Sequence, residues 1–292
     1  MRILLTNDDG IEAPGLRVLE HIANEITKDV WIVAPETDNS GASHSLTLSE
    51  PLRMRELGKR HYAVKGTPTD CVIMGVRFLL RDQPADLVMS GVNRGQNLAD
   101  DVTYSGTVAG AIEGALLGVP SIAMSLVTGP AEADQGTGLP KWETPMQLGA
   151  ELVRKLLKAG WSEGVVLNVN FPDCEPEAVK GSIATAQGQR DPDLLRIEDR
   201  LDTRGRAYYW VGIERRRAKP PKGTDLSRSH RCVLTSPIGV QGKSSAWCST
   251  LAVTADMHTV ATRASVPYVG TIIIKRSLSS STSTMLGFFG GK

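Results

Sequence analysis

Short apolar runs alternate with amphipathic stretches along residues 1–175. Five of the runs have the length and composition of buried strands, and they cover 2–6, 30–34, 86–90, 120–126 and 165–172. The stretch after the first run, 14–26, carries Leu16, Leu19, Ile22 and Ile26 at helical spacing. Repeated β-α-β units of this kind predict parallel strands with right-handed crossovers. The expected fold class is therefore α/β, with a Rossmann-like, mostly parallel sheet flanked by helices.

Further helices are expected from Pro68, Ser105 and Thr144, where capping residues precede apolar positions spaced three or four apart. A short pair of strands is expected over 52–65. From residue 181 the pattern becomes irregular and rich in β-type residues. Tyr208-Tyr209-Trp210-Val211, preceded by a glycine turn at 202–205, predicts an exposed hairpin arm within about 181–215. Aromatic side chains on such an arm indicate packing against another subunit.

Two adjacent acids follow the first strand directly, as Asp8 and Asp9. In an open α/β sheet, ligands bind in the crevice outside the carboxyl ends of the strands. Paired carboxylates there favour a site for a hard cation such as Mg²⁺ or Mn²⁺. An ordinary surface turn is the alternative, because Asn-Asp-Asp-Gly is also good turn chemistry.

The connection from Ser90 to Ser105 is long for a strand-to-helix loop, and long loops in compact domains are typically functional. It ends in Ser105-Gly106-Thr107, which opens the next helix with two hydroxyls and free backbone N–H groups. The positive end of the helix dipole there favours an anion such as phosphate. A plain N-cap is the alternative reading. Hydroxyls in the segment 39–45 are expected above the same sheet edge, with loop solvation as their alternative role.

Composition narrows the class of protein. The chain has 292 residues, is 41% hydrophobic, and carries 33 basic against 32 acidic residues, for a formal net charge of +1. That balance excludes the basic footprint of a general nucleic-acid binder, so no stable nucleic-acid partner is expected. The first strand begins at Arg2 and no apolar run reaches the length of a membrane span, so we expect a cytoplasmic protein without membrane contact. The four cysteines show no Cys-x-x-Cys pairing, which argues against a zinc site or a disulfide framework.

Several motifs in a fixed order resemble the SurE family, the stationary-phase survival proteins that are metal-dependent 5′-nucleotidases. They are Thr6-Asn7-Asp8-Asp9-Gly10, Val33-Ala34-Pro35, Ser40-Gly41-Ala42-Ser43, Gly66-Thr67-Pro68-Thr69-Asp70-Cys71, Ser90-Gly91-Val92-Asn93, Gly95-x-Asn97, Asp101-Val102, Tyr104-Ser105-Gly106-Thr107-Val108, Asn168-Val169-Asn170, Arg204-Gly205-Arg206 and Thr224-Asp225-Leu226. The resemblance implies a nucleotidase domain over 1–226, with a core over 1–175.

What the resemblance implies for the site can be given residue by residue. The metal ligands fall on Asp8, Asp9, Ser40 and Asn93, and the anchors of the substrate phosphate on Asn97, Ser105, Gly106 and Thr107. One divalent ion per subunit, Mg²⁺ or Mn²⁺, is expected, with a nucleoside monophosphate as substrate. Asp8 and Asp9 are the expected catalytic residues, and the subunits are expected to form a homodimer or a tetramer.

The expected reaction is hydrolysis of nucleoside 5′-monophosphates to nucleoside and phosphate. Attack by a metal-bound water, with Asp8 or Asp9 as base or orienter, is one route, and direct attack by a carboxylate is another. His44 is either an acid for the leaving oxygen or a solvated loop residue. Two other classes stay open: a nucleotide- or metal-sensing module without turnover, and a phosphatase of the haloacid-dehalogenase type. The latter needs Asp-x-Asp, whereas this chain has adjacent aspartates.

The family pattern ends after Leu226. Residues 227–292 contain Asp256 as their only acid and finish in a serine- and threonine-rich run. So abrupt a change indicates a divergent tail, a low-complexity linker or a change of reading frame. The change affects the features that members of the family form with their C-terminal segment, chiefly the exchange of segments between subunits and the tetramer.

Overall fold

The computed structural model describes residues 1–128, 140–191, 195–213, 221–227 and 268–276. Its main feature is a nine-stranded sheet in the order β3-β4-β2-β1-β5-β6-β7-β11-β8. Strands β4 to β11 in that order pair in parallel, and β3 and β8 are added antiparallel at the two edges. The strands cover β1 Arg2–Thr6, β2 Asp29–Pro35, β3 Arg53–Gly58, β4 His61–Lys65, β5 Leu87–Arg94, β6 Ser121–Leu126, β7 Val165–Phe171, β8 Val179–Ala184 and β11 Tyr268–Arg276. The predicted α/β class with a mostly parallel sheet is confirmed.

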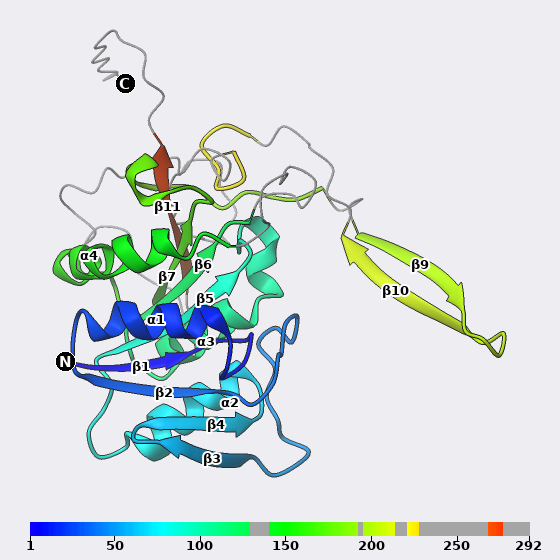
Figure 1. Ribbon diagram of the computed structural model, residues 1–292, viewed down its shortest axis with the longest axis horizontal. Helices are drawn as coiled ribbons and strands as arrows, with labels where there is room; N and C mark the ends of the chain where they lie inside the picture. The colour runs from blue at the N-terminus through cyan, green and yellow to red at the C-terminus, as the bar shows by residue number, and fades with distance from the viewer. Residues whose placement is uncertain (129–139, 192–194, 214–220, 228–267, 277–292) are drawn as a thin grey trace, which may run out of the picture.

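Helices cover both faces of this sheet (Figure 1). On one face lie α1 (Pro14–Asn24) and α4 (Glu143–Ala159), and on the other lie α2 (Pro68–Ile73) and α3 (Gly106–Leu116). Successive residues of β1 alternate between the two cores: Ile3 and Leu5 pack with the α1 and α4 side, and Leu4 packs with the α2 side. Burial on both faces explains why the central strands read as continuous apolar runs rather than as alternating ones.

Helix α3 lies unusually close to the sheet because three of its glycines face it. A Cβ atom added to Gly110 would lie 2.9 Å from Thr6 Cγ2, and one on Gly114 would lie 2.4 Å from Ser121 Oγ. Real Cβ contacts are longer, so only glycine permits this approach at both positions. The first glycine of the series, Gly106, meets the functional site described below.

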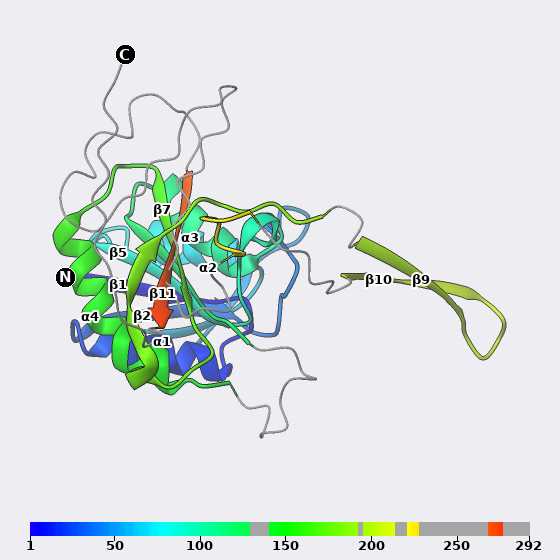
Figure 2. The ribbon, with the colours of Figure 1, turned by 90° about the horizontal axis from the view of Figure 1, so that it is seen from above.

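The hairpin arm expected from the aromatic run is present. Strands β9 (Leu195–Leu201) and β10 (Ala207–Ile213) form a separate two-stranded antiparallel sheet. Figures 1 and 2 show it pointing away from the body of the molecule. Its large apolar side chains are open to solvent, with Ile197 72%, Tyr209 64% and Val211 74% exposed.

The structure revises the end of one strand and adds a turn after it. Strand β5 does not end at Ser90 but runs to Arg94, with an irregularity in its pairing to β6 between Ser90 and Asn93. A 3₁₀ turn over Ala99–Thr103 then occupies part of the segment expected to be a loop. The connection is therefore shorter and more structured than the sequence indicated.

The C-terminal segment contributes to the sheet. Strand β11, which lies beyond residue 226, pairs in parallel with β7 and antiparallel with β8. The sheet of the core expected over 1–175 is thus extended by β8 and by one strand from the segment 227–292. Apart from Ser227, the rest of that segment lies outside the described residues, and the domain boundary at 226 stays a prediction. Within the described ranges no helix is both long and apolar enough to span a bilayer, and the cytoplasmic location likewise stays a prediction.

Candidate metal and phosphate site

The two adjacent acids lie at the carboxyl end of β1, in the turn that leads to α1. The Asn7 side chain closes this turn, since its Nδ2 donates to the Gly10 carbonyl at 2.9 Å. Gly10 has a φ of 100°, a left-handed value that favours glycine. The motif residues around the two acids therefore serve to hold them at the edge of the sheet.

Asp8 lies against the N-terminus of α3. The hydroxyl of Thr107 donates to Asp8 Oδ1, and the Thr107 backbone N–H also donates to this carboxylate. A Cβ added to Gly106 would lie 2.7 Å from Asp8 Cβ, so glycine is required for the helix to approach this closely. Burial raises the pKa of Asp8, which is only 4% exposed, and the Thr107 hydrogen bonds oppose that shift.

Asp9 is half-buried beside Asp8. Burial, and then the charge of Asp8, raise its pKa to about 6. The Arg94 backbone N–H donates to the carboxylate and acts in the opposite direction, and the charge of nearby Asp38 adds to the increase. Two desolvated carboxylates that repel each other are stabilised when a cation lies between them.

The other two predicted ligands reach the same edge of the sheet. Asn93 sits at the end of β5, next to the residue whose N–H meets Asp9, and its Nδ2 donates to the Gly95 carbonyl at 2.9 Å. That bond leaves the side-chain oxygen of Asn93 for another partner. Ser40 lies in an exposed turn tied to Asp8, because the Asn39 N–H donates to the Asp8 carbonyl at 2.8 Å.

The four side chains together offer a donor set made only of oxygen. Within the described part of the chain, no three His, Cys, Asp or Glu side chains form a cluster that could hold an ion. The expected ligand set adds the amide oxygen of Asn93 and the hydroxyl of Ser40 to the two carboxylates, and this assignment stays a prediction. Carboxylate, amide and hydroxyl oxygens suit Mg²⁺ or Mn²⁺ rather than a thiophilic metal.

Three of the predicted phosphate anchors lie at the N-terminus of α3, and the fourth, Asn97, lies in the segment before it. Ser105 is the N-cap of α3, where its Oγ accepts from the Val108 N–H at 3.1 Å, so its own hydrogen stays available to an anion. Gly106 presents its backbone at the same helix end. Thr107 is 0% exposed and gives its hydroxyl to Asp8. Its expected role as a phosphate anchor stays a prediction, and the contact with Asp8 is a role that the sequence did not indicate.

Asn97 is fixed by two asparagines of β7. Its N–H donates to Asn170 Oδ1 at 2.8 Å, and its carbonyl accepts from Asn168 Nδ2 at 2.8 Å and from Asn170 Nδ2 at 3.1 Å. Its own Nδ2 donates to Ser125 Oγ at 2.8 Å. The sequence carried a signal for this support, since two asparagines at alternate positions of an otherwise apolar strand require buried partners.

His44 is not a freely solvated loop residue. Its Nε2 lies 2.9 Å from Oε2 of Glu113, which projects from α3 and is 9% exposed. The neighbouring Ser43 hydroxyl donates to the Thr103 carbonyl at 2.6 Å. Both contacts hold the segment after β2 against α3 and the 3₁₀ turn that precedes it.

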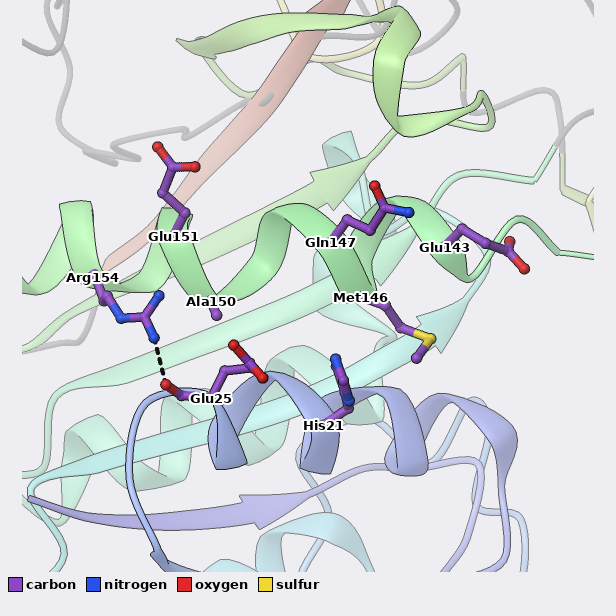
Figure 3. Close-up of a pocket in the computed structure, with 8 residues that line it drawn as sticks. All are labelled: His21, Glu25, Glu143, Met146, Gln147, Ala150, Glu151 and Arg154. Atoms are coloured by element: carbon purple, nitrogen blue, oxygen red, sulfur yellow. Dashed lines mark hydrogen bonds between the residues drawn. The ribbon is translucent and has the colours of Figure 1, made fainter.

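A separate hollow of about 560 Å³ lies between α1 and α4 (Figure 3). Figure 3 shows Arg154 of α4 reaching toward α1, where it donates to the Glu25 carbonyl. The hollow is lined by His21, Glu25, Glu143, Met146, Gln147, Ala150, Glu151 and Arg154. None of these residues belongs to the Asp8 and Asp9 site.

Comparison with known proteins agrees with the sequence motifs. The family model for the survival protein SurE matches residues 3–193. A protein named 5′-nucleotidase SurE from Methylobacterium nodulans is 58% identical over 226 residues, which cover 77% of this chain and 88% of that protein. A 5′-nucleotidase SurE from Parvibaculum lavamentivorans is 55% identical over 240 residues, covering 82% of this chain and 84% of its own.

The fold agrees as well. The crystal structure of the SurE protein from Aquifex aeolicus superposes with a TM-score of 0.66 at 39% identity, and the match covers 78% of this chain and 89% of that one. Sequence and structure thus match over most of the length of the related proteins, and the chain belongs to the SurE family.

Proposed function

We propose that the protein is a metal-dependent 5′-nucleotidase that hydrolyses nucleoside 5′-monophosphates to nucleoside and phosphate. The observation that carries the proposal is a pair of desolvated carboxylates, of which Asp8 contacts the N-terminus of α3 and Asp9 lies beside Asp8. This arrangement puts a cation site beside an anion site, as transfer of a phosphoryl group to water requires. The relatives named 5′-nucleotidase support the same reaction.

One divalent ion, Mg²⁺ or Mn²⁺, is the proposed cofactor, held by Asp8, Asp9, Ser40 and Asn93. When bound, such an ion polarises a phosphoryl oxygen and lowers the pKa of a coordinated water. The oxygen donor set and the raised pKa values of both acids support this assignment.

Side chains and backbone groups of the protein bind the phosphate and orient the reacting groups. Asn97, the Ser105 hydroxyl and the backbone at Gly106 hold the phosphate and stabilise charge on its oxygens. Thr107 fixes the orientation of Asp8 through two hydrogen bonds. Asp9 is the more accessible of the two acids and is therefore the better placed group to orient the attacking water or to accept its proton.

Phosphate release from AMP and GMP, measured with and without added Mn²⁺, tests the proposal. We expect turnover that EDTA abolishes and that Mg²⁺ or Mn²⁺ restores. Full activity in EDTA contradicts the metal assignment. Tight nucleotide binding without phosphate release identifies a sensing module, and a trapped aspartyl-phosphate identifies the dehalogenase-type mechanism.

We further propose that the arm packs against a second copy of the chain in a homodimer or a tetramer. The strand register places Ile197 opposite Val211, and Tyr209 two residues before it, on one exposed apolar face. Exposed apolar surface of this kind marks interaction sites. Light scattering of Ile197→Lys should show a smaller assembly than the wild type, whereas Glu198→Gln on the opposite face should not. An unchanged mass for Ile197→Lys refutes the assignment.

A further inference from the structure

A buried acid far along the chain is held against the segment that carries the proposed phosphate anchors. Asp225 is 0% exposed. Its Oδ2 accepts from the Ala99 N–H at 2.7 Å, and its Oδ1 accepts from the N–H groups of Gly188 and Leu226, each at 2.7 Å. Both oxygens of this carboxylate are thus used to join three separate parts of the backbone.

Ala99 is in a conformation that needs such support. Its φ is 51°, in the left-handed region that alanine rarely adopts. Besides the N–H bound by Asp225, its carbonyl accepts from Gln187 Nε2 at 2.8 Å. Side chains 126 and 88 residues away in sequence therefore hold both polar backbone groups of Ala99.

Asn97 lies two residues before this point and is held from the other side. The asparagines of β7 bind its N–H and its carbonyl, and the intervening Leu98 is 1% exposed. The tripeptide from Asn97 to Ala99 is consequently fixed at both ends. Both supports act on the backbone around Asn97, whose side chain in turn donates to Ser125 Oγ at 2.8 Å.

The second anchor is tied to the same assembly through Asp101. Arg190 makes a two-point ion pair with the Asp101 carboxylate, with Nε at 2.6 Å from Oδ1. The Asp101 carbonyl accepts from the Ser105 N–H at 3.1 Å. The segments 187–190 and 224–226 thus brace the whole stretch from Asn97 to Ser105.

We propose that Asp225 is a positioning residue for phosphate binding, acting through Ala99 on Asn97; this inference rests on the proposed function. Asparagine, its uncharged isostere, cannot replace Asp225, because the two carboxylate oxygens accept hydrogen bonds from three backbone N–H groups. Asparagine offers one oxygen, so its amide nitrogen would face at least one donor. The close approach of Gly188, whose added Cβ would lie 2.7 Å from Asp225 Oδ1, leaves little room for rearrangement.

The test is the steady-state kinetics of Asp225→Asn with AMP and saturating Mn²⁺, together with calorimetric binding of inorganic phosphate in the presence of Mn²⁺. We expect KM and the phosphate Kd to rise about tenfold, as for one lost hydrogen bond to a charged group. The Mn²⁺ midpoint and kcat should stay within about twofold of the wild type. In an Asn97→Ala background, Asp225→Asn should have little further effect on KM, because both changes remove one interaction.

Thr224→Ala is the matched control. It removes a hydrogen bond to the Pro221 carbonyl in the same turn without touching the segment from 97 to 105, so its KM should equal that of the wild type. Where Asp225→Asn does not fold, Gln187→Met takes its place, since it removes only the donor to the Ala99 carbonyl and should raise both constants severalfold. A folded variant with unchanged KM and phosphate Kd, or fully additive effects with Asn97→Ala, overturns the proposal. An inactive wild type instead refutes the proposed function, and phosphate binding then still tests the positioning.

Discussion

Thr107→Val separates two roles that a threonine at this helix end could have. The resemblance assigns Thr107 to the substrate phosphate, whereas the structure shows its hydroxyl donated to the buried carboxylate of Asp8. Valine has nearly the shape of threonine and carries a methyl group in place of the hydroxyl. The variant therefore tests whether Thr107 acts on the proposed metal ligand Asp8 or on the substrate.

The magnitude follows from the burial of the pair. Asp8 is 4% exposed and Thr107 is 0% exposed, so water does not replace the lost donor. A hydrogen bond to a charged group contributes about 1.5–3 kcal/mol, and loss of a group that orients a metal-ligating carboxylate costs roughly 10- to 100-fold in metal affinity. Because the lost donor also raises the pKa of Asp8 further, a proton competes more strongly with the ion at neutral pH.

Mn²⁺ titration of AMP hydrolysis at saturating nucleotide is the assay. The midpoint for Thr107→Val should move to roughly tenfold higher Mn²⁺ or more, with KM for AMP changed little. Thr107→Ser keeps the hydroxyl and should stay near the wild-type midpoint. An unchanged Mn²⁺ midpoint together with a KM for AMP raised about tenfold in Thr107→Val refutes the reasoning. That result would assign the Thr107 hydroxyl to the substrate phosphate.

Three further outcomes are expected. Ser40→Ala should weaken activation by the metal, and excess Mn²⁺ should partly restore the activity. Ser105→Ala should lower kcat/KM about ten- to hundredfold with an unchanged Mn²⁺ midpoint. If the metal titrations show the opposite pattern, the assignments of the two serines are reversed. Gly106→Ala should lose most activity and about 1–3 kcal/mol of stability in urea unfolding, since its Cβ would lie 2.7 Å from that of Asp8; wild-type activity contradicts the close approach. Burial raises the pKa of Asp225, so the folded protein binds this proton more tightly than the unfolded chain. Its contribution to the free energy of unfolding is present below about pH 4 and is lost as pH rises through the raised pKa. The free energy of unfolding in urea should therefore depend less on pH for Asp225→Asn than for the wild type. An equal pH dependence of the two proteins contradicts this expectation.

The sequence predicted the features that depend on local pattern. Apolar runs located the central strands, and the ends of those strands placed Asp8 and Asp9 at the ligand edge of the sheet. Parallel sheets make this step reliable, because the carboxyl ends of neighbouring strands meet at one edge. The hairpin around the turn 202–205 was readable for the same reason, since it needs only adjacent residues.

Features that arise from contacts between distant segments were not readable. Nothing near Asp225 in the sequence indicates that it binds Ala99, 126 residues earlier. The hydroxyl of Thr107 looked like part of an anion site because a helix N-terminus attracts any anion, and the buried anion it meets is the Asp8 side chain. Strand β11 comes from a segment whose composition gave no reason to expect pairing with β7.

The glycines of α3 have a consequence for the order of events in folding. A glycine in a helix interior costs about 1 kcal/mol relative to alanine, so a helix of 11 residues with Gly110 and Gly114 in its interior has little intrinsic stability. Its stability comes from contact with the sheet, at distances that only a missing side chain permits. Helix α3 should therefore form as it docks rather than before. The N–H groups and hydroxyls at its first turn should therefore become ordered together with the contact of α3 with the sheet.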